Sequence, residues 1–439
     1  MVGTSVSPTG EHWTRTDSLA FWSFGLGMLL ENYVFSMSSI ATGWVSMPKS
    51  LQSLLLAWSP IWLIIGIAVA GPLSDVMGRK NTFYLTMSLY GLGAIGLVFS
   101  STYLWILVFL ALMLFAAGGE MNTIMAASHE VMPHKHRSKT MFMELNFINL
   151  GGMLLAAVSL FSISNSVSFQ RGMVAIAFLV VLAILFVMRK NTPESIRWLE
   201  RKGMTKRAQA EIAKYYGEVE YQARQEAARM ATEAAERQDN GHPRNPSTFL
   251  KLFVTITISF AGSAGFGLMT YVLGPSYFKP FTAWIILVAT GVGFFSGFLG
   301  LWADRWSRKN LLLLGYGGTF LMTVLIYGTV GSWTKNMSFF WVLLVALNLF
   351  VNIGYLTEDT LKAEVWPTKV RGTLTAIVRF VSIGLYIVTI YMSQHYSLSQ
   401  YMLFNLVVWA IGLAGALAWY WRGIETGRGT SLDTASGER

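Results

Sequence analysis

The chain has 439 residues, of which 53% are hydrophobic and only 13% are charged. Soluble domains carry roughly twice this fraction of charged residues, so the composition excludes a water-soluble globule and predicts a membrane protein. The net charge of +10 would suit a nucleic-acid partner, but the cations gather in short segments on one side of the predicted spans, as the positive-inside rule describes. The absence of cysteine excludes disulfides, thiolate metal sites and a catalytic cysteine.

Apolar runs of about 20 residues predict transmembrane helices. Twelve such runs follow one another, near residues 18–42, 54–74, 82–100, 103–127, 140–163, 171–189, 249–272, 282–302, 310–331, 338–361, 372–392 and 400–421. If the N-terminus is cytoplasmic, the outer loops hold few cations, namely Lys49, Arg171, Lys279 and Lys335. We therefore expect an all-α membrane protein whose two termini are both cytoplasmic.

One polar segment divides the spans into two sets of six. Residues 200–247 have a helical composition of Ala, Glu, Arg and Lys and end in Asn, Gly and Pro residues that break helices. We expect a solvated cytoplasmic linker there, between an N-terminal six-helix bundle over residues 18–199 and a C-terminal one over residues 248–421. Residues 1–17 and 422–439 would form cytoplasmic tails.

Two loop motifs occur once in each set of spans. The stretch 71–81 (Gly-Pro-Leu-Ser-Asp-Val-Met-Gly-Arg-Lys-Asn) returns as 300–310 (Gly-Leu-Trp-Ala-Asp-Arg-Trp-Ser-Arg-Lys-Asn). The stretch 130–137 (Glu-Val-Met-Pro-His-Lys-His-Arg) returns as 364–371 (Glu-Val-Trp-Pro-Thr-Lys-Val-Arg). The two offsets nearly agree, so the halves read as copies in the same orientation. Parallel repeats are typical of transporters that hold their solute between the halves.

The Gly-x-x-x-Asp-x-x-Gly-Arg-Lys loop resembles the signature of the major facilitator superfamily. Residues 193–199 (Pro-Glu-Ser-Ile-Arg-Trp-Leu) and 425–433 resemble motifs of its sugar-porter branch, which is related to metabolite:proton symporters and organic-ion carriers. The resemblance implies alternating access in a monomer in the lipid bilayer of the plasma membrane. The implied partners are a small-molecule solute and protons, without a cofactor, a metal or nucleic acid.

By the same resemblance, the motif charges form a cytoplasmic gate that closes the inner side when the cavity faces outward. The expected members are Asp75, Arg79, Glu130, Arg137, Glu194 and Arg197 in the first half, and Asp304, Arg308, Glu364 and Arg371 in the second. Because these pairs must break during transport, they should bias conformations rather than bind solute. A helix cap and topology signal is the structural alternative. Ser307 replaces the expected Gly, so the second copy departs from the motif.

Acidic residues inside spans are candidates for proton coupling, because a charge in the membrane is costly and indicates function. Such acids are Glu31, Glu120, Glu144, Glu358 and Asp359, and we take the first three as proton-coupling candidates. The resemblance favours Glu31, since proton-coupled sugar porters place an acid in a comparable part of span one. The Arg that usually pairs with it is replaced by Leu110. For Glu120 and Glu144, an ion-paired structural role is the alternative.

Polar residues at helical spacing predict a substrate cavity. Span ten carries Asn348, Asn352, Tyr355, Asp359 and Lys362 on one face, and Asp359 and Lys362 should pair locally. The remaining cavity candidates lie in spans five and eleven: Asn149, Arg379, Ser382 and Tyr386. Interhelical hydrogen bonding that only packs the bundle is the alternative interpretation.

The solute class is open to three interpretations. Gly262 and Ser263 stand where sugar porters carry a Gln pair, whereas the guanidinium of Arg379 suits a carboxylate. These features favour proton-coupled symport of a small organic acid or related metabolite. A sugar or polyol symporter or uniporter is the first alternative, and a proton-driven exporter of organic cations or drugs is the second. An enzyme is not expected, because neither a nucleophile–base pair nor metal-ligand spacing is evident.

Overall fold

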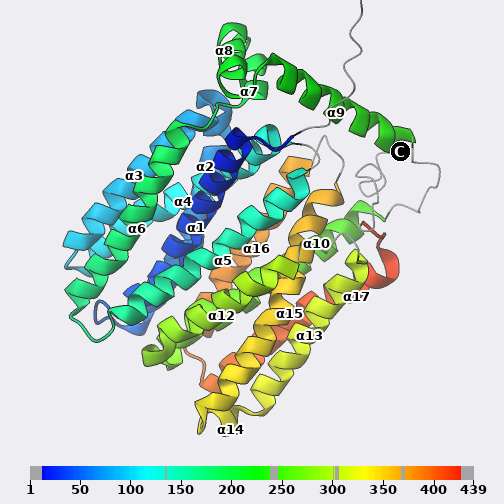
Figure 1. The fold of residues 1–439 in the computed structure, drawn as a ribbon. Coiled ribbons are helices and arrows are strands. Elements are labelled where there is room, and N and C mark those ends of the chain that lie inside the picture. The colour runs from blue at the N-terminus through cyan, green and yellow to red at the C-terminus, as the bar shows by residue number, and fades with distance from the viewer. Residues whose placement is uncertain are drawn as a thin grey trace, which may run out of the picture.

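The computed structural model describes residues 12–133, 136–237, 246–299, 301, 306–366 and 371–426, and the regular structure within these ranges is helical (Figure 1). The first set of helices comprises α1 (Arg15–Ala41), α2 (Lys49–Met77), α3 (Arg79–Phe99), α4 (Tyr103–Val131), α5 (Arg137–Phe161) and α6 (Val167–Lys190). Three further helices follow: α7 (Ile196–Arg201), α8 (Thr205–Tyr215) and α9 (Glu218–Arg237). The second set comprises α10 (Thr248–Gly267), the π-helical turn η2 (Leu268–Val272), α11 (Leu273–Tyr277), the 3₁₀ turn η3 (Lys279–Phe281), α12 (Thr282–Gly297), α13 (Arg308–Gly328), α14 (Val330–Trp333), α15 (Met337–Glu364), α16 (Arg371–Ser393) and α17 (Leu398–Arg422).

Eleven helical stretches of the described chain are long and apolar enough to cross a membrane. In the second set, α10 continues through η2 and α11 as one such stretch, and η3 continues into α12 as another. Helix α1 is not among the eleven, because it carries Glu31, Asn32 and several Ser residues. It is nevertheless buried along most of its length and packs against α4, α5 and α6.

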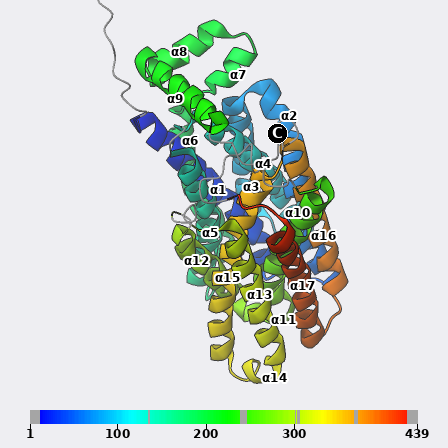
Figure 2. The same ribbon diagram turned by 90° about the vertical axis from the view of Figure 1, so that its right-hand side faces the viewer.

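The two sets of helices build separate apolar cores, one centred on α1–α6 and one on α10–α17. The same pairings recur in each core: α1 packs on α5 as α10 packs on α16, and α3 packs on α4 as α13 packs on α15. The second set is grouped together in Figure 2. These recurring pairings follow the repeat in the sequence.

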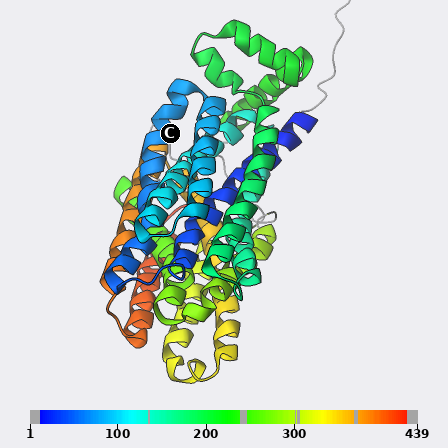
Figure 3. The same cartoon turned by 90° about the vertical axis from the view of Figure 1, so that its left-hand side faces the viewer.

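The two cores meet along two seams. Helix α5 packs against α12, and α2 packs against α16. The second pair is seen as the neighbouring blue and orange helices of Figure 3. Each seam joins one helix of the first set to one of the second, so the space between the seams is bounded by both sets.

Glycine permits the closest helix contacts within each set. A Cβ atom at Gly118 of α4 would lie 2.2 Å from the carbonyl oxygen of Leu63 in α2, and one at Gly315 of α13 would lie 2.5 Å from the Cα atom of Gly354 in α15. Small residues let membrane helices approach until their backbones touch. These two contacts hold α2 to α4 and α13 to α15.

Helices α7, α8 and α9 cover the end of the bundle at which α1 begins (Figure 1). Arg224 of α9 pairs with the buried Asp17 of α1 at 2.7 Å. The hydroxyl of Thr16 donates a hydrogen bond of 3.0 Å to the carbonyl oxygen of Tyr215. The linker helices are therefore fastened to the first helix of the bundle.

Candidate functional site

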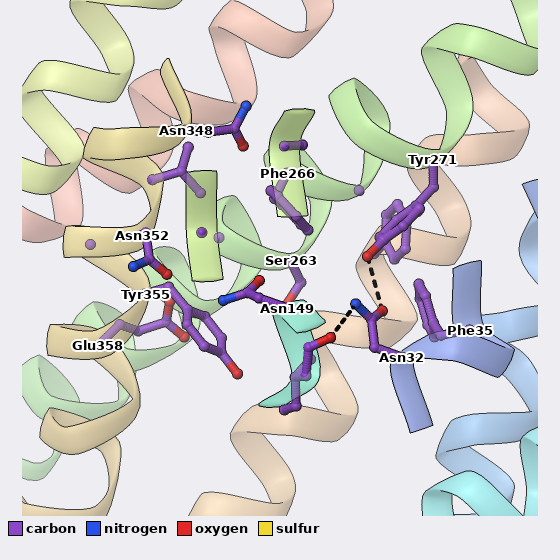
Figure 4. Close-up of a pocket in the computed structure, with 18 of the residues that line it drawn as sticks. Asn32, Phe35, Asn149, Ser263, Phe266, Tyr271, Asn348, Asn352, Tyr355 and Glu358 are labelled. Atoms are coloured by element: carbon purple, nitrogen blue, oxygen red, sulfur yellow. Dashed lines mark hydrogen bonds between the residues drawn. The ribbon is translucent and has the colours of Figure 1, made fainter. Parts of the chain in front are cut away.

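A cavity of about 210 Å³ lies between the two sets of helices. Helices α1, α5 and α15 all contribute amide side chains to its wall, as Figure 4 shows for Asn32, Asn149, Asn348 and Asn352. The full polar lining consists of Glu31, Asn32, Asn149, Ser263, Tyr271, Tyr316, Thr319, Asn348, Asn352, Tyr355, Glu358, Lys362 and Tyr386. Aromatic side chains, including Phe35, Phe266 and Trp409, complete the wall. A concave, largely apolar site with a few converging polar groups is typical of small-molecule binding.

The amides are held in place by hydrogen bonds. Asn32 donates to the carbonyl oxygen of Ile148 at 2.8 Å and accepts from the phenol of Tyr271 at 3.0 Å, which joins α1, α5 and η2. Asn352 donates to the hydroxyl of Ser296 at 2.8 Å. Tyr271 lies in the π-helical turn, and such turns often occur at functional sites. The lining is thus preorganised before any solute arrives.

Glu31 is the acidic group of α1 at the cavity wall. Only 6% of the residue is exposed, and its Oε2 atom is buried without a hydrogen-bond partner in the described part of the chain. A carboxyl group in this situation can exchange a proton when the cavity changes access.

A second charged group lies on α15 and α16. Lys362 pairs with Glu358 at 2.7 Å and with Asp359 at 3.2 Å, so the local pair expected on this helix is present. Arg379 pairs with Asp359 at 3.3 Å. Both cations near the cavity therefore have acidic partners.

The structure brings five of the seven cavity candidates to the wall: Asn149, Asn348, Asn352, Tyr355 and Tyr386. The other two are not part of its lining. Arg379 turns to Asp359, and the hydroxyl of Ser382 donates to the carbonyl oxygen of Val378 in its own helix at 2.5 Å. The helical period of span eleven placed these residues on one face, but of the three only Tyr386 lines the cavity, together with Ile383 of the same helix.

Glu120 and Glu144 do not line the cavity. Glu120 of α4 pairs with Arg189 of α6 at 2.5 Å and accepts a hydrogen bond of 2.6 Å from Thr86 of α3. The Arg189 guanidinium also lies 3.4 Å from the ring centre of Phe83. This arrangement is the ion-paired alternative considered for Glu120. Glu144 is 1% exposed, and the hydroxyl of Ser128 lies beside its carboxylate.

Three of the expected gate residues of the first half, Asp75, Arg79 and Glu130, form one network. Arg79 pairs with Asp75 at 2.8 Å and with Glu130 at 3.0 Å, and Glu130 also pairs with Arg201 at 3.1 Å. Arg197 is exposed and borders a surface recess beside Glu130.

Glu194 caps the start of α3. Its Oε1 atom accepts from the backbone N–H of Arg79 at 3.0 Å, and the end of the helix dipole there favours an anion. Burial raises the pKa of the Glu194 carboxyl above its usual value of 4.5, against the opposing effect of the backbone donors. Glu425 repeats this role in the second half, where it accepts from the backbone N–H of Arg308 at 2.7 Å and from the hydroxyl of Ser307.

The contacts of four expected gate residues fall outside the described part of the chain. Asp304 lies outside the described residues, as do the side chains of Arg137, Glu364 and Arg371.

Sequence reasoning missed several residues of the wall. Asn32 directly follows Glu31 in an apolar span, and Glu358 precedes the expected Asp359–Lys362 pair. Both could have been predicted to line the cavity, because they are polar residues inside spans. The sequence did not distinguish Tyr271, Phe266 and Trp409 as wall residues, because aromatic residues are common in membrane helices and interfaces.

Comparison with known proteins gives concordant results. The sequence profile of the Major Facilitator Superfamily matches residues 18–388. The probable metabolite transport protein CsbC of Bacillus subtilis is 24% identical over 75% of this chain and 73% of its own length. The niacin transporter NiaP of Acinetobacter baylyi is 25% identical over 42% of each chain. The inward-open structure of the xylose transporter XylE from E. coli superposes with a TM-score of 0.72 at 19% identity, covering 94% of this chain and 98% of that one. The chain therefore belongs to the Major Facilitator Superfamily, and it is a multi-pass membrane transporter of the sugar-porter-like branch rather than an enzyme.

Proposed function

We propose that the protein is a proton-coupled symporter of a small neutral metabolite with several hydroxyl groups, a sugar or a polyol. The observation that carries this proposal is the set of four amide side chains, from three helices, at the cavity wall. An amide supplies both a donor and an acceptor, which suits hydroxyl groups. XylE, whose fold is similar, is a proton:xylose symporter.

A small organic acid is the second candidate. It was favoured in the sequence by Arg379, but that side chain pairs with Asp359 and is not part of the cavity lining. Lys362 is the cation that does border the cavity, and it is held by Glu358 and Asp359. A carboxylate solute would have to compete with both acids for the ammonium group. The similarity to a niacin transporter supports this second candidate.

We infer that Glu31 is the proton carrier that couples uptake to the gradient. It borders the solute space, and its orphaned oxygen gives it the means to gain a proton. Glu120 is better suited to a structural role, since it already has a buried cation.

We also propose how the chain is arranged in the membrane. Helix α1 would be the twelfth span, because it packs among apolar spans over its buried length. The halves 18–199 and 248–421 would rock about the cavity, with residues 200–247 and both tails in the cytoplasm. The network of Arg79, Asp75 and Glu130 would then gate the inner side of a functional monomer.

The test is uptake into proteoliposomes, with and without an inward proton gradient. Sugars, polyols, carboxylates and organic cations are screened on the wild-type protein and on Glu31→Gln. We expect accumulation of a neutral hydroxylated solute that is driven by the gradient, and we expect Glu31→Gln to retain exchange of labelled solute but lose accumulation.

Each part of the proposal has its own contrary outcome. Selective uptake of carboxylates would reject the neutral solute in favour of an organic acid. Gradient-driven accumulation that persists in Glu31→Gln would reject Glu31 as the carrier. Asn122→Ala is a suitable control, since Asn122 bonds to the carbonyl oxygen of Ile67 and does not line the cavity.

A further inference from the structure

Glu358 of α15 sits in a second carboxylate site at the cavity wall (Figure 4). The residue is 2% exposed. Its Oε1 atom accepts from the Ser259 hydroxyl and from the Lys362 ammonium, each at 2.7 Å. Its Oε2 atom lies 2.8 Å from the phenol oxygen of Tyr316 and beside Gly262, where a Cβ atom would come within 2.6 Å. The site is therefore shaped for this carboxyl group by α10, α13 and α15.

The phenol of Tyr316 faces two acceptors but has one hydrogen. Its oxygen lies 2.8 Å from Oε2 of Glu358 and 2.7 Å from the carbonyl oxygen of Ile258. A phenol oxygen can donate once and can also accept. When Glu358 is ionised, the phenol donates to Oε2. When Glu358 is neutral, its own O–H donates to the phenol oxygen, and the phenol hydrogen turns to Ile258.

Lys362 has three acceptors, one of which is the Ser259 hydroxyl at 3.0 Å. Its ammonium lies 2.7 Å from Glu358 and 3.2 Å from Asp359. If Glu358 becomes neutral, Lys362 keeps Asp359 as a counter-charge that it shares with Arg379, and Oε1 still accepts from Ser259. Each donor around Glu358 thus has an acceptor in either protonation state.

Glu120 provides a contrast in the other half of the molecule. Its partner Arg189 donates from Nε to Ser23 at 3.1 Å, but the two terminal guanidinium nitrogens have no other hydrogen-bond acceptor in the described residues. Loss of the Glu120 charge would leave a buried cation without a counter-charge, which is strongly unfavourable. Glu120 also lies away from the cavity.

We propose that Glu358 is a second proton-binding site, where a proton from the cavity binds Oε2 and is released again with only hydrogen-bond rearrangement. The charged and titratable groups around it are Lys362, Asp359, Tyr316 and Tyr355, with Arg379 behind Asp359 and Glu31 also at the cavity wall. The role of this site in transport rests on the proton-coupled function proposed above, but proton binding at Glu358 can be measured without transport.

The experiment is infrared difference spectroscopy of the purified full-length protein, with the proton alone as ligand. Acidification should increase the C=O band of protonated carboxylic acids. In Glu358→Gln, the amide N–H can donate to Tyr316 and the amide oxygen can accept from Ser259 and Lys362, so the variant mimics the neutral form. We expect this variant to lose part of the titrating band, and Glu31→Gln to keep that part. An unchanged titrating band in Glu358→Gln would overturn the proposal.

Tyr316→Phe provides an independent variant if Glu358→Gln does not fold. It keeps the carboxyl group but removes the acceptor of its proton, so the band should shift in frequency rather than vanish. A band at the wild-type frequency in Tyr316→Phe would contradict the site. Because neither measurement involves solute, a failure here is separable from failure of the neutral-solute or Glu31 assignments in vesicles.

Discussion

Arg189 and Lys362 are both buried cations paired with a glutamate, yet their surroundings differ. Arg189 has one carboxylate partner among the described residues, whereas Lys362 has two. Removing one member of a buried pair leaves an uncompensated charge. Loss of the Glu358 charge therefore leaves Lys362 with Asp359, which it shares with Arg379, whereas loss of the Glu120 charge leaves Arg189 with no carboxylate partner in the described part of the chain.

Glu120→Gln should destabilise the protein by about 3–5 kcal/mol, because it leaves Arg189 buried without a counter-charge. Thermal unfolding in detergent measures this change. The double variant Glu120→Gln with Arg189→Met should recover much of the loss, since an apolar replacement of both partners avoids the buried charge. A Glu120→Gln protein as stable as the wild type would show that the pair is not needed.

Asn352→Ala should raise KM for the solute by about 2- to 10-fold, because it removes one amide from the wall and a hydrogen bond contributes a net of about 0.5–1.5 kcal/mol. Initial rates of uptake into vesicles measure the effect. An equal increase in KM in Asn352→Ala and in the control Asn122→Ala would indicate a general loss of folding rather than a lost contact with the solute.

At the scale of single helices, hydropathy predicts where a span lies, whereas the helical period predicts which residues share a face. The apolar runs predicted most helix positions closely, because a membrane span requires a long apolar stretch. Helix α1 is long enough for a span but is less apolar than the eleven others, because it places Glu31 and Asn32 at the cavity. The period of α15 indicated that Asn348, Asn352 and Tyr355 share a face, and the structure shows that face at the cavity.

The period of α16 was less informative, because it does not show which face borders the cavity. Arg379 and Ser382 share a face with Tyr386, but Arg379 is drawn to Asp359 on α15. That attraction depends on the packing of two helices, which a sequence does not specify. For the same reason, the roles of Tyr316 and Tyr271 could not be predicted from their positions in the chain.

The cap of α3 by Glu194 should make stability depend on pH. Its pKa is raised by burial, so the folded protein binds this proton more tightly than the unfolded chain, and its contribution to stability rises as the pH falls through the folded-state pKa. The melting temperature of the wild type, relative to that of Glu194→Gln, should therefore rise as the pH is lowered from neutral towards 4.5, the usual pKa of the carboxyl group. A difference that is constant across this range would contradict the assignment.

At the scale of the whole molecule, the α5–α12 and α2–α16 seams are the main contacts between the two halves, and α1 also contacts η2, α11 and α12. Asn146 of α5 donates to the carbonyl oxygen of Phe294 in α12 at 2.9 Å. Ser39 of α1 donates to the carbonyl oxygen of Tyr271 at 2.8 Å, and Gln52 of α2 donates to that of Pro275 at 2.8 Å. Rocking of the halves must break or shift such bonds.

Tying one seam should therefore stop transport. A Cβ atom at Gly297 would lie 2.1 Å from the amide oxygen of Asn146, and cysteine is shorter than asparagine, so Asn146→Cys with Gly297→Cys brings two thiols within disulfide reach. The chain has no other cysteine. Uptake should fall to the level of empty vesicles on oxidation and return on reduction, while either single variant should be unaffected by oxidant. Full uptake by the oxidised, cross-linked protein would contradict rocking at this seam.

The carboxylate of Glu425 has a practical consequence for shortened or tagged forms of the chain. It lies only three residues beyond the end of α17, yet it holds the first backbone amide of α13. A truncation placed at the end of the hydrophobic run of α17 would look harmless on a hydropathy plot. It would, however, unfasten the beginning of a distant membrane helix, so a purification handle should be attached downstream of this residue.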